Sequence, residues 1–204
     1  MSGQAGLLLF GGAFDPPHRT HREILVAALG ALPVQGGLVL PTGEHPHKGP
    51  AQTPIEARLE LCDIAFGDVP GVAISDLDAR RDGPAFTVDT VRAIRQTHPG
   101  HRLFWIVGAD NLYCLRDWRE HHALLELATL ATVPRSDYPI TRQVLLDQDL
   151  TEAEIESILT WVLPFEPDTV SATGVRAALA AGQTPPELDP QVADRIRSLG
   201  LYTG

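Results

Sequence analysis

Two histidines three residues apart follow a pair of glycines near the start of the sequence, and this pattern indicates anion binding. Gly11 and Gly12 come directly after the apolar run 7–10, which is typical of a buried strand. Because glycine has no Cβ, the turn lets a ligand approach the backbone closely. His18 and His21 share one face of the first turn of the helix expected next, at the positive end of its dipole. Imidazoles and backbone N–H groups at that end predict a phosphate-binding site.

The residues between the glycines and the histidines suit the start of a helix. Asp15 is placed to cap this helix, and Pro16 and Pro17 suit its first turn, where a missing backbone N–H costs little. The alternative is a strand–turn–helix connection that needs its glycines only for packing. The paired histidines favour the phosphate site over that alternative.

A second loop carries Lys48, the only lysine among sixteen cationic side chains. Lysine offers a compact, mobile charge where arginine imposes a planar fork, so we interpret Lys48 as a position that requires lysine. It follows the predicted strand 37–40, and loops beyond the carboxyl ends of parallel strands form the ligand crevice of open α/β sheets. A surface lysine without function is the alternative.

A third segment follows the apolar run 103–107, which predicts a central strand buried on both faces. Gly108 permits close approach to the backbone there, and Asp110 could accept hydrogen bonds from ribose hydroxyls. Asp is also a common helix cap, so this segment alone is a weak signal.

A fourth segment, 170–176, has the residues of a capped helix that faces an anion. Either Ser171 or Thr173 could cap the helix, leaving its first N–H groups for a ligand. Arg176 lies one turn on and could hold phosphate oxygens with two donors. A capped surface helix with a solvated arginine is the alternative.

Strand-like and helix-like segments alternate along the chain. Strands are predicted at 7–10, 37–40, 72–77, 103–107 and 129–133, helices at 58–66, 87–96, 173–181 and 190–198, and the end of a further helical region at 124–127. Thr53 and Thr151 each begin the four-residue pattern of a capping box. The alternation predicts one α/β domain over 1–204, a doubly wound, mostly parallel Rossmann-like sheet with helices on both faces.

The composition is that of an acidic globular protein, with 204 residues, 44% of them hydrophobic, and a formal net charge of −10. An acidic chain is a poor general partner for nucleic acid, which requires a basic surface. No apolar stretch has the length of a membrane span and no signal-type segment is present, so we expect a cytoplasmic protein without membrane contact. Cys62 and Cys114 lie in helix-like apolar patterns, which predicts inert core thiols.

Taken together, the motifs resemble those of the HxGH nucleotidyltransferase superfamily, whose members transfer a nucleotidyl group from a nucleoside triphosphate. Residues 11–21 match its signature G-G-x-F-D-P-x-H-x-G-H, except that Thr20 replaces a glycine. The loop with Lys48 and the segment 170–176 resemble two further motifs of the superfamily, and Gly108 with Asp110 matches its G-x-D.

The resemblance implies a role for each of these residues. His18 and His21 would hold the α- and β-phosphates, and Lys48 and Arg176 would neutralise the leaving pyrophosphate. Mg²⁺ would arrive with ATP, with no dedicated metal site in the protein. Contacts to ATP are implied for Gly11, Gly12, Ala13, Phe14, Gly108, Asp110, Arg135, Ser171 and Thr173.

Further likeness to bacterial nicotinate-nucleotide adenylyltransferases implies the acceptor. Residues 82–90 resemble their G-P-S-Y-T-x-D-T segment, with phenylalanine in place of tyrosine. Thr87 would offer its backbone N–H to the pyridine carboxylate, Trp118 would stack on the pyridine ring, and Asp15 would also bind this nucleotide. A core position is the alternative for Trp118. The implied reaction converts ATP and nicotinate mononucleotide to nicotinate adenine dinucleotide and pyrophosphate.

Other functions remain open at this point. The same chemistry could act on nicotinamide mononucleotide or pantetheine phosphate. A metal-dependent hydrolase could use His18, His21, His45 and His47 as ligands. A dinucleotide-binding regulator without catalysis is a third alternative, and a homodimer is one option for the assembly.

Overall fold

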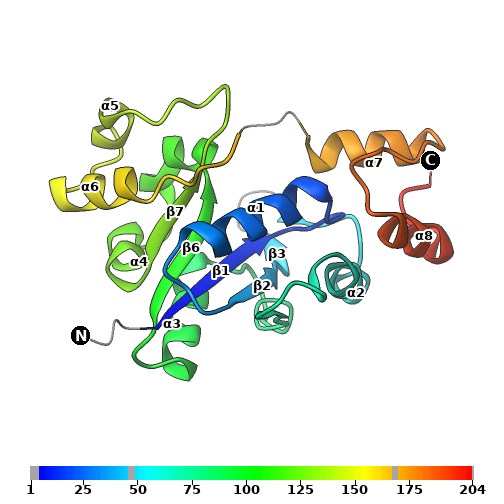
Figure 1. Ribbon diagram of the computed structural model, residues 1–204, viewed down its shortest axis with the longest axis horizontal. Helices are drawn as coiled ribbons and strands as arrows, with labels where there is room; N and C mark the ends of the chain where they lie inside the picture. The colour runs from blue at the N-terminus through cyan, green and yellow to red at the C-terminus, as the bar shows by residue number, and fades with distance from the viewer. Residues whose placement is uncertain (1–4, 46–48, 167–169, 204) are drawn as a thin grey trace. The chain divides into compact units, whose positions relative to one another are not determined.

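The computed structural model describes residues 5–45, 49–166 and 170–203. Its central element is a five-stranded sheet, of which Figure 1 labels β1, β2, β6 and β7. The strand order is β5-β2-β1-β6-β7, so the chain moves outward in one direction, returns to β1 and continues on the other side. The strands are β1 (Gly6–Gly12), β2 (Gly37–Pro41), β5 (Val72–Ile74), β6 (Arg102–Gly108) and β7 (Thr129–Val133). This reversal at the first strand is typical of doubly wound sheets, and the predicted Rossmann-like fold is confirmed.

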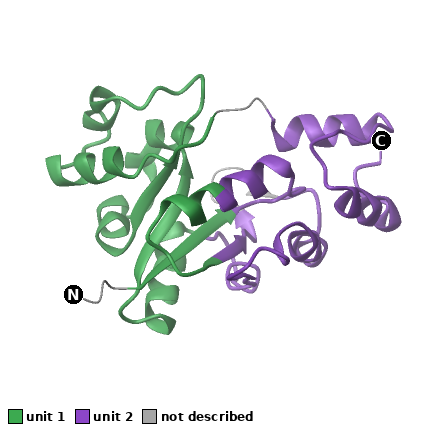
Figure 2. Cartoon of the chain, in the orientation of Figure 1, with its two compact units in different colours: residues 1–11, 27–37, 86–168 green, residues 12–26, 38–85, 169–204 purple. Residues whose placement is uncertain are grey.

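The chain divides into two compact units, each made of three separate segments (Figure 2). Unit 1 comprises residues 1–11, 27–37 and 86–168, and unit 2 comprises residues 12–26, 38–85 and 169–204. α1 (Arg19–Ala31) contributes residues to both. The sequence predicts one domain over residues 1–204. The division into two compact units does not test this, so it stays a prediction.

In unit 1, β6 pairs in parallel with β1 on one side and with β7 on the other. Residues 103–107 of β6 are all buried, which explains why this strand is apolar at every position. Around the strands lie α3 (Thr87–Thr97), the 3₁₀ helix η1 (Ala109–Asp117), α4 (His121–Leu127), α5 (Arg142–Leu146) and α6 (Glu152–Thr160). α3 packs on α4, and α6 packs on β7.

In unit 2, α2 (Ile55–Phe66) packs against α8 (Pro190–Leu199) and against β5. A short antiparallel pair, β3 (Glu44–His45) and β4 (Gly49–Pro50), and α7 (Ala172–Ala180) complete this unit. α8 begins after Asp189, whose carboxylate accepts from the Gln191 N–H. It ends at Gly200, which adopts the left-handed conformation (φ 63°) as a C-cap.

Several predicted helix starts differ from the observed ones. α1 begins only at Arg19, so the predicted cap at Asp15 is wrong, and Pro16 and Pro17 precede the helix. α2 begins at Ile55 with no side-chain cap, so the capping box predicted at Thr53 is also wrong. The capping box at Thr151 is confirmed, with its hydroxyl and the Glu154 carboxylate bonded reciprocally to the backbone.

The two cysteines have different environments, although the sequence predicts two core thiols. Cys62 is fully buried in α2, and this burial raises the pKa of its thiol. Cys114 is exposed, so the prediction of a core thiol is wrong there: η1 is a 3₁₀ helix with a kink at that residue (φ −134°). No helix within the described residues has the length and apolar character needed to cross a membrane.

Candidate active site

The two glycines after β1 make room for aromatic rings of the protein. A Cβ on Gly11 would lie 2.5 Å from the Trp105 indole, and a Cβ on Gly12 would lie 3.1 Å from the ring of Phe14. Glycine is therefore required at both positions because a larger residue would crowd these rings. The ATP contacts implied for these glycines stay a prediction.

Phe14 anchors the loop that follows. Its backbone has φ 45°, a left-handed conformation that costs a non-glycine residue roughly 1–2 kcal/mol. Its side chain is 2% exposed and makes edge contacts with Phe66 (5.6 Å between centroids) and His21 (5.1 Å). Burial of the ring offsets the backbone strain and fixes the loop beside the histidines.

The predicted histidine pair lies close together at the start of α1. The two ring centroids are 3.7 Å apart, and the planes are tilted by 31°. The backbone N–H of His18 donates to Nδ1 of His21 at 3.2 Å, so in the neutral ring of His21 the proton is on Nε2. His21 therefore presents Nε2–H as a donor, which is what a phosphate oxygen requires.

Arg176 reaches this loop from a distant part of the sequence. Its guanidinium donates to the carbonyl of Asp15 (2.7 Å), 161 residues away, and to Oγ1 of Thr173 (3.2 Å). The N-cap of α7 is Ser171, whose hydroxyl accepts from the Gly174 N–H at 3.1 Å, so the choice between Ser171 and Thr173 is decided. Thr173 lies within the first turn and orients the arginine.

Asp15 is buried in this loop, with only 4% of its surface exposed. One carboxylate oxygen accepts from the backbone N–H of Gln52 at 3.0 Å. The other accepts from the hydroxyl of Tyr202 at 2.6 Å. The contact with the pyridine nucleotide implied for Asp15 stays a prediction, and in the structure both oxygens are bonded within the protein.

Arg58 and Tyr202 belong to this site, and sequence reasoning missed both. The Arg58 side chain is 2% exposed and donates to the carbonyls of Ala13 (2.7 Å), Thr42 (2.8 Å) and Thr53 (3.1 Å). Burial lowers its pKa, while the charge of Asp15 opposes this shift. An arginine at a buried position of an apolar helix pattern was the signal that could have identified it.

Lys48 lies outside the described residues, as does His47. The structure therefore leaves the predicted role of Lys48 untested. Among the residues that it describes, no three His, Cys, Asp or Glu side chains gather as metal ligands would.

In unit 1, the segment after β6 brings the predicted nucleoside residues together. Oδ1 of Asp110 and Nε of Arg135 form a half-exposed ion pair at 2.9 Å. A Cβ on Gly108 would lie 2.4 Å from the same carboxylate oxygen, so glycine is required for the carboxylate to fold back over the backbone. The Tyr138 N–H donates to the Arg135 carbonyl at 3.1 Å, which closes a tight turn beside this pair.

Thr87 is the first residue of α3, where backbone N–H groups have no partner within the helix. It follows Phe86, whose ring is covered by the guanidinium of Arg119 at 4.9 Å from the centroid. Trp118 precedes that arginine, is half-buried, and has an extended backbone as the C-cap of η1.

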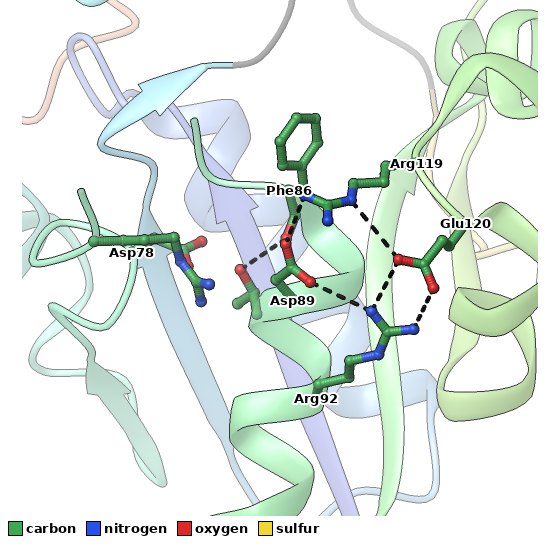
Figure 3. Close-up of polar contacts among 8 residues, drawn as sticks. Asp78, Phe86, Asp89, Arg92, Arg119 and Glu120 are labelled. Atoms are coloured by element: carbon green, nitrogen blue, oxygen red, sulfur yellow. Dashed lines mark hydrogen bonds and ion pairs between the residues drawn. The ribbon is translucent and has the colours of Figure 1, made fainter. Parts of the chain in front are cut away.

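A network of charges holds the segment that carries Trp118 (Figure 3). Arg92 pairs with Glu120 at 2.5 Å and with Asp89 at 3.4 Å. Arg119 lies 3.4 Å from the carboxylate of Asp89 and 3.7 Å from that of Glu120. The hydrogen bond from Arg92 holds the pKa of Glu120 below its usual value. These exposed pairs are individually weak, and their joint effect is to fix the chain at 118–120 relative to the start of α3.

The predicted site residues thus form separate groups. In unit 2, the loop after β1 and the start of α7 gather Asp15, His18, His21, Ser171, Thr173 and Arg176. In unit 1, one group consists of Gly108, Asp110 and Arg135, and another lies at Thr87 and 118–120.

Comparison with known proteins agrees with the motifs. A family model described as cytidylyltransferase-like matches residues 9–178. A protein of Aeromonas salmonicida named as a probable nicotinate-nucleotide adenylyltransferase is 33% identical over 210 residues, with 98% of each chain covered. A protein of the same name from Albidiferax ferrireducens is 37% identical over 173 residues, with 85% of each chain covered. The chain belongs to the nicotinate-nucleotide adenylyltransferase family.

A solved structure has the same fold as this chain. It is described as Plasmodium falciparum nicotinic acid mononucleotide adenylyltransferase complexed with NaAD. The TM-score is 0.77 with 97% of each chain covered, although only 16% of the residues are identical. The fold of the nicotinate-nucleotide adenylyltransferases thus persists at low sequence identity.

The two departures from the motifs of the nicotinate-nucleotide adenylyltransferases are accommodated locally. Thr20 replaces a glycine in the first turn of α1, where it is 6% exposed and packed inside the protein. Phe86 replaces a tyrosine and keeps the aromatic ring on which Arg119 lies. Both replacements leave the surrounding elements intact.

Proposed function

We propose that this chain transfers the adenylyl group of ATP to nicotinate mononucleotide, forming nicotinate adenine dinucleotide and pyrophosphate. Relatives at 33–37% identity carry the name of this activity, and a protein of the same fold has been solved with NaAD. The observation that carries the proposal is the bond from Arg176 to Asp15, because it joins the fourth predicted motif to the loop of the histidine pair.

The reaction requires one displacement at phosphorus. A phosphate oxygen of nicotinate mononucleotide attacks the α-phosphorus of ATP, the bond from that phosphorus to the α–β bridging oxygen breaks, and pyrophosphate leaves with the bonding electrons. No protein nucleophile is needed, so catalysis consists of positioning and charge neutralisation. His18 and His21 would donate to the α- and β-phosphates and stabilise the pentacovalent state, and Arg176 and Lys48 would neutralise pyrophosphate.

In unit 1, the remaining residues suit the nucleoside and pyridine parts of the substrates. Asp110 would accept from ribose hydroxyls and Arg135 would lie beside the adenosine, since their pair remains partly open to solvent. Thr87 would offer its backbone N–H to the pyridine carboxylate, and Trp118 would stack on the ring. Mg²⁺ would enter on ATP, which binds as the magnesium complex. We further propose a cytoplasmic enzyme, with the assembly left to direct measurement.

The test is an acceptor series with purified protein. Pyrophosphate release is measured with MgATP and nicotinate mononucleotide, nicotinamide mononucleotide or phosphopantetheine. We expect kcat/KM for nicotinate mononucleotide to exceed the others at least about tenfold, a difference of about 1.4 kcal/mol in transition-state binding. Equal or greater turnover on another acceptor would overturn the substrate assignment. Tight ligand binding without any pyrophosphate would support the regulator instead.

A further inference from the structure

Tyr202, which follows α8, makes its closest polar contact with the loop between β1 and α1. Its hydroxyl donates to Oδ1 of Asp15 at 2.6 Å, across 187 residues of sequence. That length is typical of a strong O–H···O⁻ bond to a charged acceptor. Burial raises the pKa of the Tyr202 hydroxyl, and Asp15 raises it further, so the hydroxyl keeps its proton and remains a donor at alkaline pH.

The backbone at Tyr202 is held in an unfavourable conformation. Its φ is 57°, in the left-handed region, two residues after the left-handed Gly200. A non-glycine residue keeps this conformation where the surrounding contacts determine it. The bond to Asp15 is such a contact, and it directs the hydroxyl of the half-buried tyrosine to the loop.

Asp15 connects Tyr202 to the histidines and to Arg176. Its carbonyl accepts from Arg176 at 2.7 Å, and its second carboxylate oxygen is held by the Gln52 N–H. Only two prolines, each with φ fixed by its ring, separate it from His18. A shift of Asp15 therefore moves His18 and Arg176 together.

We propose that Tyr202 is a positioning residue for adenylyl transfer: by holding the Asp15 carboxylate, it sets the relative placement of His18, His21 and Arg176. The proposal rests on the proposed function for its chemical consequence. It assigns Asp15 to the support of the loop, because the residue is 4% exposed and its carboxylate is bonded at both oxygens.

The test uses four variants of the full chain: Tyr202→Phe, Asp15→Asn, their combination, and Tyr113→Phe as a matched control. Tyr113 also donates its hydroxyl to a distant acceptor, the Pro139 carbonyl at 2.8 Å, within unit 1. We expect Tyr202→Phe to lower kcat about tenfold with KM for ATP changed less than about twofold, because small misplacements affect the transition state most. Tyr113→Phe should keep the kcat of the unsubstituted chain. All rates are normalised to the folded fraction.

The combined variant separates positioning from an independent effect. If Tyr202 acts only through Asp15, the combination has the kcat of Asp15→Asn alone. The proposal would be overturned if the two losses of kcat multiply in the combined variant, or if Tyr202→Phe leaves kcat unchanged. Should Tyr202→Phe fail to fold, Asp15→Asn must itself show the loss of kcat at unchanged KM.

A second measurement does not depend on activity. Long-range ¹H–¹⁵N spectra of the histidine rings report the protonated nitrogen of His21, which the structure identifies as Nε2 in the neutral ring. Tyr202→Phe should shift the His18 and His21 signals, and Tyr113→Phe should not. Unmoved signals would overturn the proposal. Moved signals in a protein that transfers nothing would instead overturn the proposed function.

Discussion

The two ring nitrogens of His21 have different tasks. Nδ1 accepts from the backbone N–H of His18 at the start of α1, and Nε2 carries the proton of the neutral ring. The sequence predicts that the two histidines share a face, but it does not indicate which nitrogen carries the proton. That assignment depends on a 3.2 Å contact within the loop.

Two substitutions at His21 separate the two tasks. Asparagine can replace the Nδ1 acceptor but not the Nε2 donor, so His21→Asn should change the free energy of unfolding by less than about 0.5 kcal/mol and lower kcat/KM about 10²–10³-fold. Glutamine can also accept from the His18 N–H, as in a capping box, and it places an amide nitrogen near the Nε2 position, so His21→Gln should keep the stability and more of the activity. Urea unfolding and steady-state kinetics measure the two effects, and a lower kcat/KM for His21→Gln than for His21→Asn would contradict the assignment.

At the scale of elements, the helix and strand ranges were predictable where the apolar pattern is long. The strands at 103–107 and 129–133 and the helices at 87–96 and 190–198 are confirmed within one or two residues. The helix starts at Asp15 and Thr53 were not predictable. In both cases distant groups determine the local structure: Tyr202 and Gln52 bond the aspartate side chain, and Arg58 bonds the threonine carbonyl.

Replacing glycine by alanine should have opposite effects on stability at the end of α8 and at the end of α1. Gly200 has φ 63°, so Gly200→Ala should destabilise the protein by about 1 kcal/mol. Gly30 is helical and has no atom within 4 Å of an added Cβ, so Gly30→Ala should stabilise it by about 0.5–1 kcal/mol. Thermal and urea unfolding of both variants measure the difference. Two shifts of the same sign would show that backbone conformation does not govern these sites.

For the whole molecule, the order of the motifs along the sequence carried most of the functional information. The family followed from segments at residues 11–21, 108–110 and 170–176, and the fold followed from the alternation of strand-like and helix-like segments; the comparisons bear both out. The support of the site could not be predicted in this way. Arg58 contacts the loop through a hydrogen bond to the Ala13 carbonyl, and Tyr202 through one to the Asp15 carboxylate. No residue pattern in the sequence predicts such partners.

The absence of a three-ligand metal group among the described residues leads to a prediction for the whole protein. Dialysis against a chelator should leave the midpoint of thermal unfolding unchanged, because the described residues hold no group of three ligands for a structural ion. A chelator in the assay should abolish adenylyl transfer, and added Mg²⁺ should restore it through ATP. Hydrolysis of a substrate that returns only with Zn²⁺, without adenylyl transfer, would favour the hydrolase alternative.

The unequal burial of the two cysteines has a practical use. The Cys62 thiol is enclosed and its pKa is raised, whereas Cys114 faces solvent four residues after Asp110. A maleimide fluorophore will therefore attach at one position per chain without mutagenesis. Its emission would report arrival of a nucleoside beside the Asp110–Arg135 pair, giving a direct titration of ligand in the unaltered polypeptide.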